Sequence, residues 1–377
     1  MTPQLNGFRR GGQSTVVEMS FANPETEVLV DGFAFPMAHD RRELCRRFGL
    51  SYVDTSALGL RRRRCGKGFL YCDKSGQTVR DSALKARVRQ LAIPPAWTEV
   101  CIAEDEWAHI QAIGRDADGR LQYRYHPEWD KARATAKKGR LKRLGSALPH
   151  VRSAVRKALS APGLTRTKVI AAVVRLIDRA LLRPGYEEYA RGDGGRGAST
   201  LLKRDVAVEG DKVVLEFKGK GGKDIKQELR DPLLARVLRK LVSVRGQRLF
   251  GLSDGTGGKR PITARDVNEF LAEASGSEIS AKDFRTFRAS AAALAVLAEH
   301  NGHESERLRK KAIVAAVDEA SRILVNTRSV ARSSYIHPSV IEAYEAGKLE
   351  TALLRGRMRK GLSRIEGALM RFLEKPR

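Results

Sequence analysis

The sequence predicts an α+β protein with a small sheet-containing N-terminal domain and a larger, mainly α-helical domain that includes a three-stranded β-meander. Short strand-like segments separated by turns dominate residues 50–130, whereas helical apolar spacing dominates after residue 147. The chain has 377 residues, enough for two domains, and its 42% hydrophobic content is typical of a globular protein. The expected divisions are an extension of undecided order at 1–45, domains at 46–131 and 132–345, and a basic helical tail at 346–377.

Four elements are predicted in the N-terminal domain. Residues 66–72 form a strand-like run that ends in a turn at 73–76, and residues 82–91 form a short amphipathic helix that Pro94 and Pro95 stop. Residues 97–102 alternate like a strand. A second strand, residues 121–125, mixes aromatic with polar or basic side chains.

The larger domain, expected at 132–345, begins within a dense basic stretch, residues 130–146. Such a stretch is typical of a solvated helix face or a linker and equally suits a hinge that grips phosphates. A helix capped by Thr165 follows and is expected to end at Pro184-Gly185. Strands are then predicted at 206–208, 213–217 and 225–229, with a lysine-glycine turn before the third.

The last part of this domain is predicted to be helical. Ser280 and Asp283 have the spacing of a capping box, and residues 307–324 form another helix. A third helix, capped by Asn326 or Thr327, is expected to run through Tyr335.

Charge points to a polyanionic partner. Lys and Arg outnumber Asp and Glu by 71 to 44, which gives a net charge of +27. No apolar run approaches the roughly 20 residues of a membrane span, and the N-terminus has no signal-peptide pattern. The four cysteines form no CxxC pair and no zinc spacing. We therefore expect a cytoplasmic protein with free thiols and no metal.

Tyr335 lies in a cationic segment and is the candidate nucleophile. A phenol with a reference pKa of about 10 reacts at neutral pH only where cations or a proton acceptor favour the phenolate. Arg183, Lys220 and Arg285 supply cations in three other segments. Arginines bind the non-bridging oxygens of a pentacoordinate phosphorus, and a lysine of lowered pKa protonates the leaving oxygen. The pattern predicts attack on a phosphodiester.

Each of these residues also has an ordinary structural alternative. Tyr335 would be a half-buried packing residue, and Arg183 would partner the negative end of a helix dipole. Lys220 would face solvent in its turn, and Arg285 would form a salt bridge, for example with Asp283.

Several ordered motifs make the chain similar to a known family over residues 51–345. They are GKGFLY (66–71), LAIPPAW (91–97), GRLQYRYH (119–126), LRPGYEEYA (182–190), FKGKGGK (217–223), AKDFRT (281–286) and the segment around Tyr335. In this set the chain resembles the type IB DNA topoisomerases, in particular their short single-polypeptide viral and bacterial form. The resemblance implies the fold shared by tyrosine recombinases and these topoisomerases.

The resemblance also implies roles. Arg183 and Arg285 become the catalytic arginines, Tyr335 the nucleophile and Lys220 the general acid, with Lys223 the alternative in the same turn. The family often has a histidine nine residues before the tyrosine, where this chain has Asn326. An amide donates a hydrogen bond but carries no charge, so Asn326 is expected to orient the phosphate with less electrostatic stabilisation.

For the N-terminal half, the resemblance implies the smaller half of a clamp that closes around double-stranded DNA. Gln122, Tyr123 and Tyr125 lie on the strand similar to the DNA-contacting strand of the family, and we expect contacts from Lys223 and Arg332 as well. Alternate strand residues face opposite ways, so only one of the two faces can point at DNA without a local twist. Core packing is the alternative for the two tyrosines.

The expected activity is relaxation of supercoiled duplex DNA by a monomer, through a 3′-phosphotyrosyl bond and religation, without ATP, metal or another cofactor. No GxxxxGK[ST] phosphate loop occurs in the sequence. One rival is a tyrosine recombinase, although these enzymes typically carry His-x-x-Arg where this chain has Lys282-x-x-Arg285. The other is a basic DNA-binding protein without activity.

Overall fold

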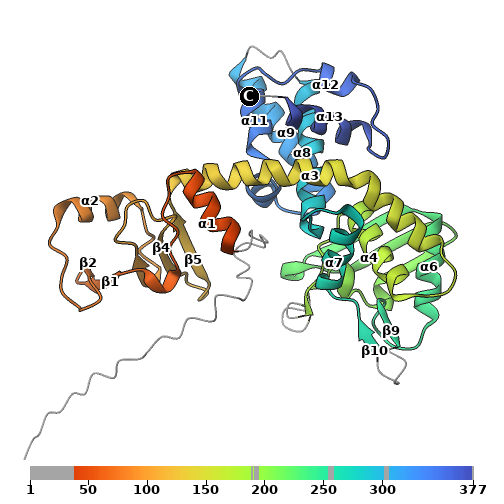
Figure 1. The fold of residues 1–377 in the computed structure, drawn as a ribbon, viewed down its shortest axis with the longest axis horizontal. Helices are drawn as coiled ribbons and strands as arrows, with labels where there is room; N and C mark the ends of the chain where they lie inside the picture. The colour runs from red at the N-terminus through yellow and green to blue at the C-terminus, as the bar shows by residue number, and fades with distance from the viewer. Residues whose placement is uncertain (1–37, 188–189, 191–194, 254–258, 301–304, 376–377) are drawn as a thin grey trace, which may run out of the picture. The chain divides into compact units, whose positions relative to one another are not determined.

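The computed structural model describes residues 38–187, 190, 195–253, 259–300 and 305–375. It divides into two compact units, residues 1–128 and 129–377. Most of the expected extension, and the Glu188-Tyr189 pair of the LRPGYEEYA motif, lie outside the described residues. The predicted α+β fold class is confirmed (Figure 1).

The first unit is built on a five-stranded antiparallel sheet of order β2-β1-β3-β4-β5. Val100 and Ile102, two residues apart, pack with one small core. Ile110 and Ile113 pack with another, and the strand register shifts between Ile110 and Ala112. Its elements are α1 (Ala38–Arg47), β1 (Leu60–Cys65), β2 (Gly68–Cys72), α2 (Ser82–Gln90), β3 (Thr98–Ile102), β4 (Ile110–Arg115) and β5 (Leu121–Tyr125).

Two of these strands, β1 and β4, were not expected, and the strand expected at 66–72 begins two residues later. Gly66 has a φ of +56° and belongs to the β1–β2 turn. β1 contains four consecutive arginines, so it lacks the alternation of apolar and polar residues that predicts a strand. Arg62 nevertheless fits the sheet, because its guanidinium lies 4.1 Å from the Phe69 ring centroid and donates to the carbonyl of Trp97 at 2.6 Å.

The second unit combines a β-meander with helices. Its elements are α3 (Pro127–Ser160), α4 (Arg166–Ala180), β6 (Val206–Glu209), β7 (Lys212–Lys218), the turn η4 (Lys220–Gly222), β8 (Asp224–Arg230), α6 (Pro232–Ser243), β9 (Gly251–Ser253), β10 (Lys259–Pro261), α7 (Ala264–Ser275), α8 (Ala281–Glu299), α9 (Glu306–Leu324), α10 (Arg328–Val330), η5 (Ala331–Tyr335), α11 (Pro338–Glu345), α12 (Ala352–Arg355) and α13 (Arg364–Glu374).

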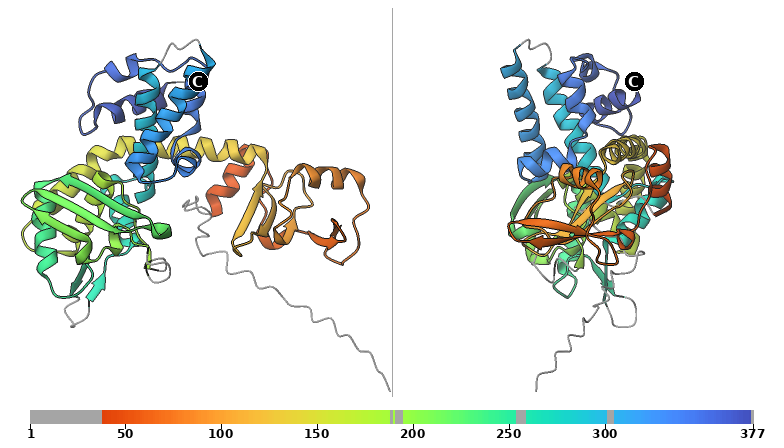
Figure 2. Two further views of the ribbon diagram at one scale, coloured as in Figure 1. Left: turned by 180° about the vertical axis from the view of Figure 1, so that it is seen from behind. Right: turned by 90° about the vertical axis from the view of Figure 1, so that its left-hand side faces the viewer.

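The meander has the predicted order and spacing. Val213, Leu215 and Phe217 of β7 are buried, while the residues between them face outward or are only half-buried. Helices α4 and α6 pack against this sheet on one side, as the view from behind shows (Figure 2). Lys220 and its neighbouring glycines form the turn between β7 and β8.

Helix α4 differs from expectation at its C-terminal end. Thr165 caps its start as predicted, accepting from the Lys168 amide at 3.2 Å. The helix ends at Ala180, and Leu181 follows in the left-handed region, so Pro184 does not stop it. Arg183 therefore lies outside the helix rather than at its last turn.

The centre of this unit is α8, which packs against α9 and α13. The capping box of Ser280 and Asp283 is confirmed at its start. Residues 346–377, expected to be a tail, instead contribute Leu353 and Leu369 to the main core. Glu366, in the same C-terminal segment, is fully buried, and its carboxylate pairs with Arg152 of α3.

The basic stretch 130–146 lies within α3, a continuous helix of 34 residues. The expected domain boundary at 131/132 falls inside this helix, whereas the compact units divide between Glu128 and Trp129.

Candidate active site

Tyr335 is the last residue of a π-helical turn. The amide of Ile336 donates to the carbonyl of Ala331 at 2.9 Å, five residues back, and Ile336 itself is extended. Thr327 caps the preceding helix by accepting from the Val330 amide, so the expected cap is Thr327 and not Asn326. The tyrosine side chain is 7% exposed. Such π turns often occur at functional sites.

Arg285 holds its guanidinium over this tyrosine, 4.9 Å from the ring centroid. It is buried and donates to the carbonyls of Leu324, at 3.0 Å, and Leu181. These carbonyls lie at the C-terminal ends of α9 and α4, where the helix dipoles favour a cation. Its partners are therefore two helix ends, and Asp283 is occupied in the capping box.

Two strained turns set the positions of Arg183 and Asn326. Leu181 and Val325 end their helices with φ of 51° and 50°, a left-handed conformation that is unfavourable for a branched side chain. The backbone N–H of Asn326 closes the second turn by donating to the Ser321 carbonyl at 3.0 Å. Strain of this kind concentrates at functional sites.

Arg183 and Asn326 meet between these turns. A guanidinium nitrogen of Arg183 donates to Asn326 Oδ1 at 2.9 Å. Arginine carries donors alone, so this bond settles which amide atom is the oxygen and leaves Nδ2 pointing elsewhere. Asn326 Nδ2 is buried and has no hydrogen-bond partner among the described residues. The amide thus has a donor available for a ligand oxygen.

The electrostatics favour a phenolate. Burial raises the pKa of Tyr335, but the charges and hydrogen bonds of Arg285 and Arg183 outweigh burial and bring its pKa below the usual value. Burial lowers the pKa of Arg285, against the opposite effect of the phenol. Two guanidinium groups beside one phenol have the charge to bind an anion.

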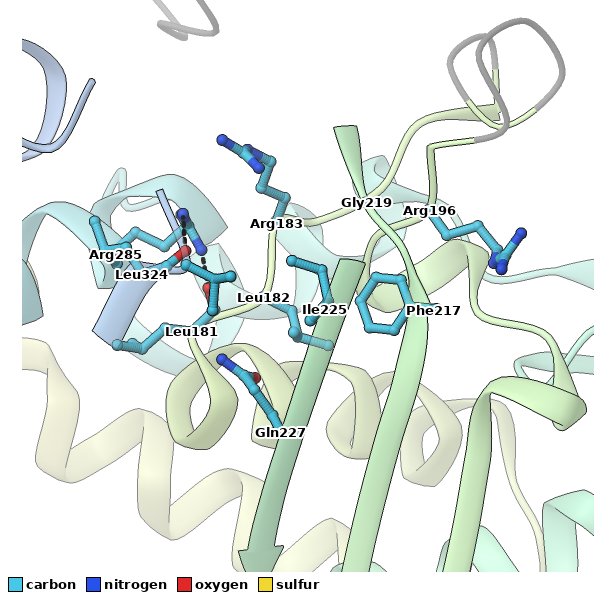
Figure 3. A pocket seen from close by; sticks show the side chains of 11 residues that line it. Leu181, Leu182, Arg183, Arg196, Phe217, Gly219, Ile225, Gln227, Arg285 and Leu324 are labelled. Carbon is cyan, nitrogen blue, oxygen red and sulfur yellow. Dashed lines mark hydrogen bonds between the residues drawn. The ribbon is translucent and has the colours of Figure 1, made fainter. Parts of the chain in front are cut away.

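A small cavity joins the two arginines to the lysine-bearing turn, and Tyr335, Asn326 and Lys220 are not among the residues that line it. Arg183 and Arg285 line it together with Gly219, the residue before Lys220 (Figure 3). Lys220 is exposed. Lys223, three residues on, donates to the Val325 carbonyl at 3.3 Å and ties the turn to the segment that carries Asn326.

A close approach of two glycines fixes the backbone of Arg183. The Arg183 carbonyl accepts from the Ala198 amide at 2.7 Å. A Cβ added to Gly197 would lie 2.6 Å from the Cα of Gly185, which has a φ of +91°. Any larger residue at position 197 would have to displace the backbone next to Arg183.

The strand expected to contact DNA lies in the first unit. Tyr123 and Tyr125 stack with ring centroids 5.7 Å apart and pack partly against a small core. Gln122 faces the other way, and its Nε2 donates to Asp116 at 2.8 Å. Arg332 is exposed in the turn that ends at Tyr335.

Two polar residues next to the nucleophile were not identified from sequence. Lys137 of α3 and Ser290 of α8 donate to backbone carbonyls of residues 334–336. Lys137 is one cation in a long basic run and Ser290 follows no motif, so only the three-dimensional structure distinguishes them.

The sequence is similar to those of known proteins. The family model "Eukaryotic DNA topoisomerase I, catalytic core" matches residues 128–356, and "Bacterial DNA topoisomerase IB, N-terminal domain" matches residues 68–116. The chain is 31% identical to the DNA topoisomerase 1B of Acanthamoeba polyphaga mimivirus over 297 residues, which is 76% of this chain and 88% of that protein. No helix among the described residues is long and apolar enough to cross a membrane.

Proposed function

This chain belongs to the type IB DNA topoisomerases, and from that premise we propose that Tyr335 is the nucleophile with which it relaxes supercoiled duplex DNA. The phenol oxygen attacks a backbone phosphorus, forms a 3′-phosphotyrosyl bond and breaks the bond to the 5′-oxygen. The phenolic proton leaves to water. The lowered pKa of Tyr335 supports this role because it makes the phenolate easier to form.

Arg183, Arg285 and Asn326 stabilise the negative charge on the non-bridging oxygens of the transition state. Support comes from the two guanidinium groups that act on the phenol oxygen and from the buried Asn326 Nδ2 without a partner. Fixed donors aimed at developing charge commonly contribute a factor of about 10²–10³ each.

Lys220 donates the proton that the departing 5′-oxygen needs. It adjoins the cavity lined by both arginines, and its side chain is exposed to an incoming strand. Lys223 is the less suitable donor because its ammonium is bound to the Val325 carbonyl. The same lysine removes the proton when the 5′-hydroxyl attacks the phosphotyrosine and reseals the strand. The covalent link conserves the bond energy, so the cycle needs no ATP.

The enzyme acts as a monomer whose two units clamp the duplex while the cut strand rotates about the intact one. The net charge of +27 supports extensive phosphate contact. One face of strand β5 contacts the duplex from the first unit, through either Gln122 or the pair Tyr123 and Tyr125. Lys223 and Arg332 contact it from the second unit. We propose that it works in the cytoplasm, associated with the nucleoid.

The observation that carries this proposal is the phenol of Tyr335, which has the Arg285 guanidinium over its ring and is acted on by Arg183 as well. The test is plasmid relaxation in EDTA without ATP, comparing wild type with Tyr335→Phe, which keeps the ring and its packing. Wild type should relax the plasmid and form a detergent-stable DNA adduct, and the variant should do neither. Relaxation by the Phe variant would rule out this nucleophile. Recombinant plasmid products would favour the recombinase alternative, and an inactive wild type the non-enzymatic one.

A further inference from the structure

Side chains from two other helices bind the three consecutive carbonyls around the nucleophile. The Lys137 ammonium of α3 donates to Ser334 O at 3.1 Å and to Ile336 O at 3.4 Å. Between them, the Ser290 hydroxyl of α8 donates to Tyr335 O at 3.2 Å. The backbone on both sides of Tyr335 is therefore attached to α3.

The local conformation explains why these carbonyls need such donors. The π turn ends at Tyr335 and Ile336 is extended, so the carbonyls leave the regular helical ladder in largely buried surroundings. A buried carbonyl without a donor costs about 1–3 kcal/mol. An ammonium carries three donors on a flexible stem and suits two carbonyls that point to one side.

A second attachment lies two residues further on. His337 is buried, and its Nε2 lies 3.1 Å from the Ala134 carbonyl of α3. Its amide donates to the Ser290 hydroxyl at 3.0 Å. Together, Lys137 and His337 link one turn of α3 to the segment that carries the nucleophile.

We propose that Lys137 is a positioning residue for strand cleavage, which fixes the backbone on both sides of Tyr335 and thereby aims its phenol oxygen. The inference rests on the assignment of Tyr335 as the nucleophile. Lys137 binds the backbone of the tyrosine segment and acts on the reaction through that segment. A displacement of about 1 Å in a reacting group can cost roughly 10²-fold in rate.

One alternative is that Lys137 supplies a proton to the leaving oxygen. Burial, with the neighbouring charge of Arg133, lowers the pKa of Lys137 to about 8, a value that suits an acid–base group. The two roles differ in one respect. A positioning residue is needed whatever the leaving group, whereas a proton donor is dispensable when the leaving group is a thiolate of low pKa.

The experiment measures single-turnover cleavage by the full chain at saturating enzyme. The substrate is a duplex oligonucleotide with a cleavage site mapped beforehand on plasmid DNA. The site lies close to one end, so that the short strand released with a 5′-hydroxyl dissociates and religation is prevented. Lys137→Met removes the charge and the donors at similar length. Lys142→Met is the matched control, because it removes the same charge from the same helix and no contact links it to residues 334–336. Affinity for the substrate and Tm are measured for each variant.

We expect Lys137→Met to cleave about 10- to 100-fold more slowly than Lys142→Met, with equal affinity. Its Tm should be lower by only a few degrees, because two carbonyls lose their donor while the protein stays folded. Lys137→Arg should recover part of the rate, because it keeps donors and charge. On a substrate with sulfur in place of the 5′-bridging oxygen, Lys137→Met should stay slow while Lys220→Ala recovers.

Three outcomes would overturn the proposal. Equal cleavage by the Lys137 and Lys142 variants would remove the positioning role, and recovery of Lys137→Met on the sulfur substrate would make the residue a proton donor. Loss of folding in both Lys137→Met and Lys137→Gln would show that it serves stability alone. Cleavage by Tyr335→Phe in the same assay would instead refute the assignment of the nucleophile.

Discussion

Replacing Asn326 tests the amide that stands where the family often has histidine. Asn326→Ala removes the unpartnered Nδ2 donor and the oxygen that accepts from Arg183 at 2.9 Å. Asn326→Asp keeps the shape and the acceptor but replaces the donor with negative charge. Asn326→His restores a ring N–H that carries positive charge when protonated.

The interaction that each variant loses or gains sets the expected change in the cleavage rate. A hydrogen bond to a charged group contributes about 1.5–3 kcal/mol, so the alanine variant should cleave roughly 10- to 150-fold more slowly than wild type. The aspartate variant should be at least about tenfold slower again, because its carboxylate pairs with Arg183 and repels the phosphate. The histidine variant should match or exceed wild type below its pKa of about 6.5, and its advantage should shrink as pH rises.

Single-turnover cleavage on the oligonucleotide substrate, from pH 5.5 to 8.5, measures all three variants. Similar rates for Asn326→Ala and wild type would show that the amide does not contact the phosphate. An aspartate variant as fast as wild type would refute the placement of Nδ2 beside a non-bridging oxygen.

Three further predictions concern stability, geometry and charge. Arginine bonds outweigh burial and hold the pKa of Glu366 at about 2, below its ordinary 4.5, so its stabilisation is complete above pH 4.5 and is lost as pH falls toward 2. Glu366→Gln should therefore reduce the free energy of unfolding by roughly 3 kcal/mol at pH 7 in denaturant titrations, and an unchanged value would contradict the ion pair. Gly197→Ala would place a Cβ 2.7 Å from the Arg183 carbonyl oxygen, so cleavage should fall at least about tenfold, whereas the helical control Gly139→Ala should be neutral. DNA affinity should fall with salt at a log–log slope of about −0.9 per phosphate contacted, and a flat response would contradict the clamp.

Local signals predicted the elements that carry most of the site. Alternation of Val213, Leu215 and Phe217 located the central strand of the meander, and the Ser280–Asp283 pair located the start of α8. Both features depend on residues that are close in sequence, so they can be predicted from a single amino-acid sequence.

Other features could not be read because they depend on contacts between distant segments. Leu181 and Val325 adopt left-handed turns that sequence rules reserve for glycine, so the helix before Arg183 was expected to end at the proline. Lys137 and the nucleophile segment that it binds are 197 residues apart in the sequence. The C-terminal segment is helical as expected, but its packing into the core was not predicted, because basic surface residues obscured the apolar face of α13, which includes Leu369.

Arg285 has a consequence for how this protein can change over time. Its guanidinium binds carbonyls at the ends of α4 and α9 and also faces Tyr335. The same cation therefore serves both the fold and the active site. A descendant that gave up strand cleavage but still gripped DNA would be free to lose the tyrosine while selection for folding preserved the arginine. Among inactive relatives, an intact arginine at this position is therefore no sign of surviving catalysis.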